Sequence, residues 1–253
     1  MNLEAYFERI SYTGSREPTL ETLYALHRQH QYVIPFETLD IHLPRTIVLE
    51  NDRIFEKLIN ERRGGFCYEQ NGLFSQVLRE LGYQDITLLE AQVYDAQGNL
   101  TVRFDHLALT VTIAGERWLV DVGFGSKIIE PLRLDDPGEQ SVEGRIYRVQ
   151  HNGEQGHYSK RDENGGWMHE YLFYLQPRTL VDFADTCRYH QTPESPFSSR
   201  RMATMPSPDG RVTYQNDTLT IRKGDEYTEY LLHSEDEIRA VLKKHFGIEL
   251  PQI

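Results

Sequence analysis

The sequence predicts an α+β protein of more than one domain, because helical and strand-forming segments are separated along its 253 residues. Apolar residues recur at helical spacing as far as about residue 82, whereas residues 86–176 contain strand-like runs punctuated by turns. A helix is predicted near 179–190, and the rest of the chain combines short strands with a final helix. A chain of this length can bury a substantial core.

Three helices are predicted in the first segment. Thr19 and Asp52 each precede an apolar series at helical spacing and are expected to begin helices. The next helix is expected to begin at Cys67, after two glycines, and to end at Gly82; its apolar series is Leu73, Phe74, Val77, Leu78 and Leu81.

The position of Cys67 predicts a reactive thiol. A helix N-terminus carries partial positive charge and free N–H groups, which stabilise a thiolate and lower the pKa of the sulfur. The alternative is a buried structural cysteine that acts as a small hydrophobic residue. The residues that follow in the chain favour the reactive interpretation.

Residues 107–113 and 116–125 are apolar or β-branched and are predicted to form strands, with Ala114-Gly115 as the turn between them. A two-residue loop pairs Ile113 with Glu116 and places His106 and Asp121 on one face as diagonal neighbours, about 7–8 Å apart at the backbone. A three-residue loop would place them on opposite faces. Because Ala is a poor residue for positive φ, we expect a type II or bulged turn rather than type I′.

Cys67, His106 and Asp121 together match the nucleophile, base and orienting acid of nucleophilic catalysis. His106 would take the thiol proton, and Asp121 would hold the imidazole in the required tautomer. The other nine histidines show no metal-ligand spacing. The alternative for Asp121 is a structural aspartate that caps a loop.

Turn signals divide the remaining chain. Asp95–Asn99, Asn152-Gly153 and Asn164–Gly166 predict hairpins. Strands are expected around Asp209-Gly210 and over 218–222 and 227–233, and Ser234 is expected to cap a last helix that ends at Gly247.

Three stretches carry a resemblance to a known family. They are residues 63–71 (Arg-Gly-Gly-Phe-Cys-Tyr-Glu-Gln-Asn), 105–107 (Asp-His-Leu) and 120–125 (Val-Asp-Val-Gly-Phe-Gly). In this order and spacing they closely resemble the arylamine N-acetyltransferases, as do residues 34–39, 182–183 and 192–197. The resemblance extends over residues 1–220, and its departures are Thr38 and Cys187, where asparagine is expected.

The resemblance implies the domain plan. Residues 1–82 would form an N-terminal helical bundle carrying Cys67, and residues 83–177 a β-barrel-like domain carrying His106 and Asp121. Residues 178–198 would form an interdomain helix and linker, and residues 199–253 a C-terminal α/β lid. The papain-like cysteine triad would lie in a cleft between the first two domains.

The resemblance also implies the activity, which is transfer of an acetyl group from acetyl-CoA through a Cys67 thioester to an arylamine or arylhydrazine, without a metal. Phe36, Val93 and Phe197 match positions that line the acceptor pocket in the family, although each could equally be plain core. Arg63 and Glu37 match a structural ion pair behind the active site. The pantetheine arm of CoA would pass Gly123, Gly125, Ser126 and Lys127, for which an ordinary strand exit is the alternative.

Composition restricts the other possibilities. The net charge of −12 argues against nucleic acid as a partner. No apolar run reaches the length of a membrane span, and the acidic start does not resemble a secretory signal. With only two cysteines, one of them a candidate thiolate, we expect a reducing cytoplasmic location. For the oligomeric state, we expect a monomer or homodimer. The rival functions are a papain- or transglutaminase-like thiol enzyme that does not use CoA, and a binding protein without activity.

Overall fold

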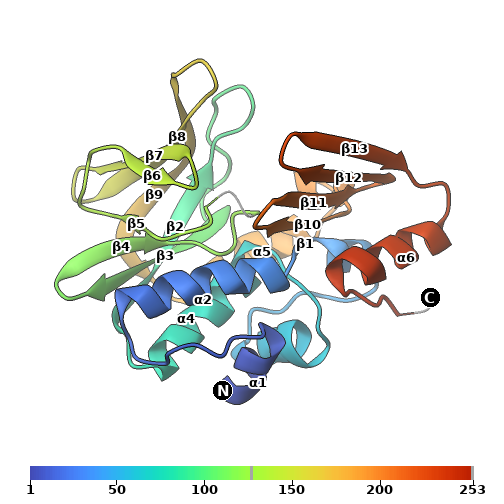
Figure 1. The fold of residues 1–253 in the computed structure, drawn as a ribbon, viewed down its shortest axis with the longest axis horizontal. Coiled ribbons are helices and arrows are strands. Elements are labelled where there is room, and N and C mark those ends of the chain that lie inside the picture. Colours follow the sequence, from blue (N-terminus) through green and yellow to red (C-terminus); the bar gives the residue numbers. More distant parts are fainter. Residues whose placement is uncertain (126–127, 252–253) are drawn as a thin grey trace.

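The computed structural model describes residues 1–125 and 128–251 and combines helices with two antiparallel sheets (Figure 1). In Figure 1 the two sheets stand side by side, with α2 and α4 beneath the larger sheet and α6 beneath the smaller one. The α+β class predicted from the sequence is therefore confirmed. The domain boundaries at residues 82, 177 and 198 stay a prediction.

The N-terminal helices begin close to the predicted positions. Thr19 caps α2 by accepting a hydrogen bond from the Thr22 N–H at 3.2 Å. Cys67 is the first residue of α4, and Gly82 follows that helix at φ +88°. The helix expected at Asp52 begins one residue earlier. The elements are α1 (Leu3–Arg9), α2 (Leu20–Val33), the 3-10 turn η1 (Leu39–His42), α3 (Asn51–Phe55), the π-helical turn η2 (Glu56–Asn60) and α4 (Cys67–Glu80).

The larger sheet has eight strands in the order β5-β4-β3-β2-β9-β8-β7-β6. Buried side chains from its two ends, Leu132 of β5 and Val142 of β6, belong to one hydrophobic cluster, so the sheet curls around a common interior like a barrel. Its strands are β2 (Gln84–Val93), β3 (His106–Ile113), β4 (Glu116–Val120), β5 (Leu132–Arg133), β6 (Gln140–Val142), β7 (Arg145–His151), β8 (Gln155–Arg161) and β9 (Trp167–Arg178).

The β3–β4 hairpin has the predicted register. Ile113 pairs with Glu116 and Leu109 with Val120, as a two-residue loop requires. The predicted turn type is wrong, because Ala114 and Gly115 both have positive φ, +51° and +83°, which is typical of type I′. The twist of the two strands favours this turn and outweighs the cost of the left-handed region at Ala114.

The smaller sheet has the order β1-β10-β11-β12-β13 and takes its edge strand from the start of the chain. β1 (Phe36–Glu37) pairs with β10 beside the cysteine-bearing segment, a contact that the sequence did not predict. The final helix has its Ser234 cap, and Gly247 follows at φ +67°. The remaining elements are η3 (Leu180–Phe183), α5 (Ala184–His190), η4 (Pro196–Ser199), β10 (Met202–Ser207), β11 (Gly210–Gln215), β12 (Thr218–Lys223), β13 (Glu226–Leu231) and α6 (Glu235–Phe246).

Candidate active site

Cys67 lies where α4 meets the beginning of β3. Its sulfur is 3.8 Å from the carbonyl oxygen of Asp105, the residue before His106, and the side chain is buried. The residue before the helix, Phe66, has no side-chain acceptor for the first-turn N–H groups, unlike the usual Ser, Thr or Asp caps. The amides at the start of α4 therefore remain available to stabilise negative charge near the sulfur.

The electrostatic environment of Cys67 differs from the sequence-based expectation of a lowered pKa. Burial, followed by the negative charge of Asp105, raises the pKa of the Cys67 thiol well above its ordinary value, and the backbone N–H of Leu107 opposes this only in part. The sequence indicates the helix N-terminus, but no local pattern indicates that the Cys67 thiol is removed from water. A thiolate at Cys67 consequently needs a cation beside it.

The His106 imidazole is held by a carboxylate. The His106 Nε2 and Asp121 Oδ2 atoms are 2.7 Å apart, and both side chains are buried. The imidazole also lies between two aromatic rings, with centroids 5.0 Å from Phe124 and 5.2 Å from Tyr171. With Nε2 donating to Asp121, Nδ1 is the nitrogen that can accept a proton.

Two further groups hold Asp121 in this orientation. Its Oδ1 accepts hydrogen bonds from Asn71 Nδ2 at 2.8 Å and from the Gly123 N–H at 2.9 Å. Asn71 lies one helical turn after Cys67, and its Oδ1 accepts the Val122 N–H at 3.0 Å. Asn71 therefore joins the cysteine helix to the chain around Asp121. Its spacing of four residues from Cys67 was the available signal for this role.

Gly123 allows the close approach of these two segments. A Cβ atom at this position would lie 2.7 Å from Asn71 Nδ2 and 2.8 Å from Cys67 Cα. This packing explains the glycine without any ligand. The further expectation that Gly123 and Gly125 guide the pantetheine arm stays a prediction, and Ser126 and Lys127 lie outside the described residues.

A buried histidine on α2 supports the same segment. His27 Nε2 accepts the Asp121 N–H at 3.2 Å, and Nδ1 is 3.0 Å from the Ile129 carbonyl oxygen. Burial lowers the pKa of His27 to about 4, so the ring is neutral at physiological pH and can act as donor and acceptor at once. Nothing in the sequence distinguished His27 from the other histidines without a spacing pattern.

A cluster of five buried charges supports the turn that carries Cys67. Arg63 donates to Glu37 at 2.7 Å and to Asp40 at 2.8 Å, which confirms the predicted Arg63–Glu37 pair. Lys57 Nζ lies 2.8 Å from Glu69 Oε1 and 3.0 Å from Asp40 Oδ2. Although burial opposes its charge, the neighbouring carboxylates raise the pKa of Lys57 above its ordinary value.

The cluster reaches the cysteine through Glu69, whose Oε2 accepts the Phe66 N–H at 3.2 Å. This contact fixes the residue that precedes Cys67. The sequence predicted only one ion pair of the cluster because Asp40, Lys57 and Glu69 lie in three separate segments.

The three candidate acceptor residues lie in different elements. Phe197 packs edge-on against Phe66, with ring centroids 6.2 Å apart. Phe36 in β1 forms a bridge to Gly65, and Val93 ends β2 opposite Tyr171. All three are partly buried. Their assignment to an acceptor pocket stays a prediction.

The described residues contain neither a candidate metal site nor a membrane-spanning helix. No group of three or more His, Cys, Asp or Glu side chains within residues 1–125 and 128–251 could hold a metal ion. Over the same residues, no helix has the length and apolar character needed to cross a membrane.

The arrangement has the chemical parts of an acyl-transfer site. Cys67 offers a nucleophile, the His106–Asp121 pair offers a base of fixed tautomer, and the first turn of α4 offers N–H groups for a developing oxyanion.

Comparison with known proteins identifies relatives of the whole chain. The N-acetyltransferase family profile matches residues 19–253. The arylamine N-acetyltransferase pineal gland isozyme of Gallus gallus is 33% identical over 99% of this chain and 95% of its own length. The solved arylamine N-acetyltransferase of Salmonella typhimurium has a TM-score of 0.90 at 31% identity, covering 99% of this chain and 92% of its own. The Mycobacterium marinum enzyme, solved in complex with CoA, has a TM-score of 0.88 at 31% identity, covering 98% and 93%.

Proposed function

Because the chain belongs to the arylamine N-acetyltransferase family, we propose that it moves the acetyl group of acetyl-CoA through a Cys67 thioester to an arylamine or arylhydrazine nitrogen. The observation that carries this proposal is the buried His106–Asp121 hydrogen bond beside Cys67 at the start of α4.

In the first half-reaction, His106 Nδ1 takes the proton from the Cys67 thiol. This transfer leaves the net charge of the site unchanged, so burial opposes it less than it opposes loss of the proton to water. The sulfur attacks the thioester carbonyl carbon, and the first-turn N–H groups of α4 stabilise the oxyanion. The C–S bond to CoA then breaks, and the CoA sulfur takes the proton from His106.

In the second half-reaction, the amine attacks the carbonyl carbon of acetyl-Cys67. His106 takes a proton from the amine nitrogen, the bond to the Cys67 sulfur breaks, and the proton returns to that sulfur. Asp121 stays ionised and stabilises the imidazolium in both halves. The enzyme therefore works by a ping-pong mechanism with CoA leaving before the amine reacts.

The acceptor is an aromatic amine or hydrazine because flat apolar walls suit an aromatic ring. Phe36, Val93 and Phe197 are the side chains that we assign to these walls, in a cleft beside Cys67. The edge-on contact between Phe197 and Phe66 supports the assignment for Phe197, since Phe66 directly precedes the nucleophile.

Intact-protein mass spectrometry tests the covalent step. Incubation with acetyl-CoA without an acceptor should add one acetyl group, and peptide mapping should locate it on Cys67. Cys67→Ser should remain unmodified. Cys187→Ser is the matched control, because burial raises the pKa of both thiols but Cys187 lies inside α5 and not at the start of a helix. An acetyl group found only on Cys187 or on a lysine would overturn the assignment.

A turnover assay separates this function from its rival. Addition of an aromatic amine to the acetylated protein should release the acetyl group as the amide. Hydrolysis of peptide or glutamine substrates without CoA would instead favour a papain- or transglutaminase-like thiol enzyme.

A further inference from the structure

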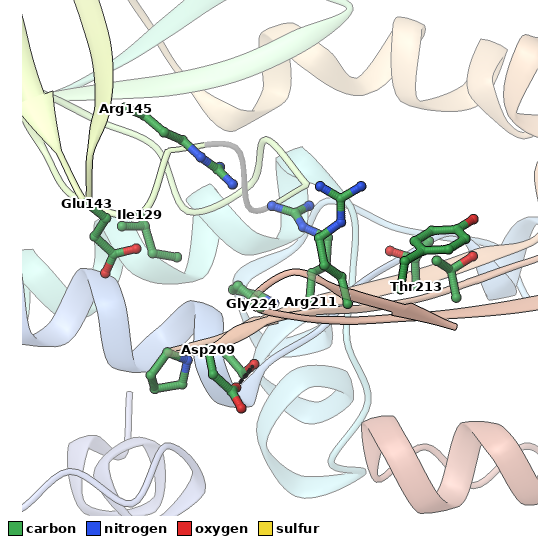
Figure 2. Close-up of a pocket in the computed structure, with 14 residues that line it drawn as sticks. Ile129, Glu143, Arg145, Asp209, Arg211, Thr213 and Gly224 are labelled. Carbon is green, nitrogen blue, oxygen red and sulfur yellow. Dashed lines mark hydrogen bonds between the residues drawn. The ribbon is translucent and has the colours of Figure 1, made fainter. Parts of the chain in front are cut away.

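A cavity of about 500 Å³ lies between the two sheets, and Cys67 is not one of the residues that line it (Figure 2). One wall is the face of the smaller sheet formed by β10, β11 and β12, and the other is the β6–β7 turn of the barrel-like sheet. No local sequence pattern indicates this cavity, because its two walls come from chain segments more than sixty positions apart.

Three arginines line this cavity. Arg211 of β11 and Arg222 of β12 are directly paired across the sheet, so their side chains leave the same face. Arg145, at the start of β7, points toward Arg211 from the opposite wall (Figure 2). Burial, with the added positive charge of Arg145 and Arg222, lowers the pKa of Arg211 to about 10.

Like charges placed directly opposite in a sheet destabilise it, and this chain has a strongly negative net charge of −12. The cluster of three guanidinium groups is therefore unusual for this acidic chain, and the repulsion between the groups destabilises the sheet. Among the residues that the structure describes, no carboxylate forms an ion pair with Arg145 or Arg222. An anion in the cavity would offset the repulsion.

The two acidic residues that line the cavity are directed elsewhere. Asp209 Oδ1 accepts a hydrogen bond from Ser207 at 2.7 Å, and Glu143 Oε1 lies 3.5 Å from the Tyr32 hydroxyl. Figure 2 shows both carboxylates turned away from the guanidinium groups of Arg145 and Arg211.

A short stretch of chain connects the cavity with the candidate active site. Arg211 Nη1 donates to the Gly125 carbonyl oxygen at 2.6 Å, and Gly123 packs against Cys67. Gly123 and Gly125 are two residues apart, which is at most about 7 Å along the chain. A donor with its thioester at Cys67 and a long flexible arm could place an anionic end in the cavity.

We propose that Arg145, Arg211 and Arg222 bind the phosphate groups of the acetyl donor, which rests on the function proposed above. Guanidinium groups match phosphate oxygens in geometry and charge. CoA carries a 3′-phosphate and a diphosphate beyond its pantetheine arm, so its acyl end and its charged end would occupy separate parts of the protein.

The test compares acetyl donors that differ in phosphate content. Arg145→Gln, Arg222→Gln and the double variant remove two exposed arginines without disturbing the Arg211–Gly125 bond. Arg53→Gln is the matched control, because Arg53 is exposed on α3 and far from the cavity in sequence. The rate of Cys67 acetylation is measured with acetyl-CoA, with acetyl-dephospho-CoA and with S-acetyl-N-acetylcysteamine, which has no phosphate.

Each single variant should lower the second-order acetylation rate with acetyl-CoA by about 10- to 100-fold, the usual effect of losing a hydrogen bond to a charged group. Acetylation by S-acetyl-N-acetylcysteamine should not change. A loss that persists with acetyl-dephospho-CoA assigns the diphosphate, and a loss that disappears assigns the 3′-phosphate. Equal effects on all three donors, or no effect on acetyl-CoA, would overturn the proposal.

A binding measurement keeps this proposal separate from the proposed function. Calorimetric titration with CoA should show weaker binding to the double variant than to the native protein or the Arg53→Gln control. This holds even if Cys67 is never acetylated, in which case the function fails and the cavity assignment stands. Binding of inorganic phosphate as tight as that of CoA would show a general anion site and overturn the donor assignment.

Discussion

Replacing Asp121 by asparagine should abolish most of the acetyl transfer while leaving the fold intact. In the native protein Oδ1 accepts two N–H groups, from Asn71 and Gly123, and Oδ2 accepts His106 Nε2–H. In the Asp121→Asn variant, the oxygen of the new amide must stay with the two fixed donors. The NH₂ group of that amide then faces His106 Nε2, which becomes an acceptor, and the ring proton moves to Nδ1. The nitrogen that should take the thiol proton is already protonated.

The expected loss in the rate of Cys67 acetylation is about 10⁴-fold, as for a triad aspartate changed in this way, which corresponds to about 5.4 kcal/mol of activation free energy. The cost in folding free energy should be only about 1.5–3 kcal/mol, the value of one hydrogen bond to a charged group. That is smaller than the stability of a typical domain, about 5–15 kcal/mol, so the variant should remain folded.

The assay is single-turnover acetylation followed by intact-protein mass spectrometry, with circular dichroism to establish folding. Asp135→Asn is the control, because Asp135 is exposed and pairs with Arg117 near the other end of β4. A folded Asp121→Asn variant that acetylates within about tenfold of the native rate, one power of ten instead of the four expected for a triad aspartate, would refute the tautomer argument. An unfolded one would identify Asp121 as a structural residue.

Three further outcomes follow from the structure. Gly123→Ala should strongly reduce acetylation because its Cβ would lie 2.8 Å from Cys67 Cα, whereas Gly72→Ala, with its nearest contact at 3.4 Å, should be tolerated; comparable rates for both would contradict the packing argument. Iodoacetamide should alkylate Cys67 below pH 7 in the native protein, but in His106→Gln only at alkaline pH, since no imidazolium then offsets the effect of burial on the thiol pKa; identical pH profiles would exclude the imidazolium pair. Burial lowers the folded-state pKa of His27 from 6.5 to about 4, so the stability that neutral His27 contributes is complete above pH 6.5 and is lost as the pH falls toward 4. Urea unfolding should therefore show a free energy of unfolding about 2 kcal/mol lower at pH 5.0 than at pH 7.5 from this group, and His27→Gln should lack this part of the loss.

The sequence predicted the elements whose signals are local. Thr19, Cys67 and Ser234 mark helix starts, and the register of the β3–β4 hairpin followed from a two-residue loop. The contact between His106 and Asp121 could be predicted for the same reason, since both lie within one hairpin.

The sequence could not predict contacts between distant segments. Asn71, His27 and Glu69 support the candidate site through bonds to residues in other elements, and no local pattern records such pairings. The burial of Cys67 also depends on distant segments. The helix start was the only local signal, and it predicted a lowered thiol pKa, whereas burial raises it. The turn type predicted for Ala114-Gly115 was wrong for a different reason. The twist of the paired strands outweighed the conformational preference of alanine.

The polar bonds between α2 and the chain after β4 make the two parts of the protein interdependent. His27 binds the main chain at Asp121 and Ile129, and Gln31 Nε2 donates to the Ile128 carbonyl at 2.8 Å. Without the strands, the polar atoms of His27 and Gln31 would lie among apolar side chains without hydrogen-bond partners. A fragment that ends at residue 82 should therefore not fold stably on its own. The helices, the strands and the candidate active site would then fold in a single cooperative step.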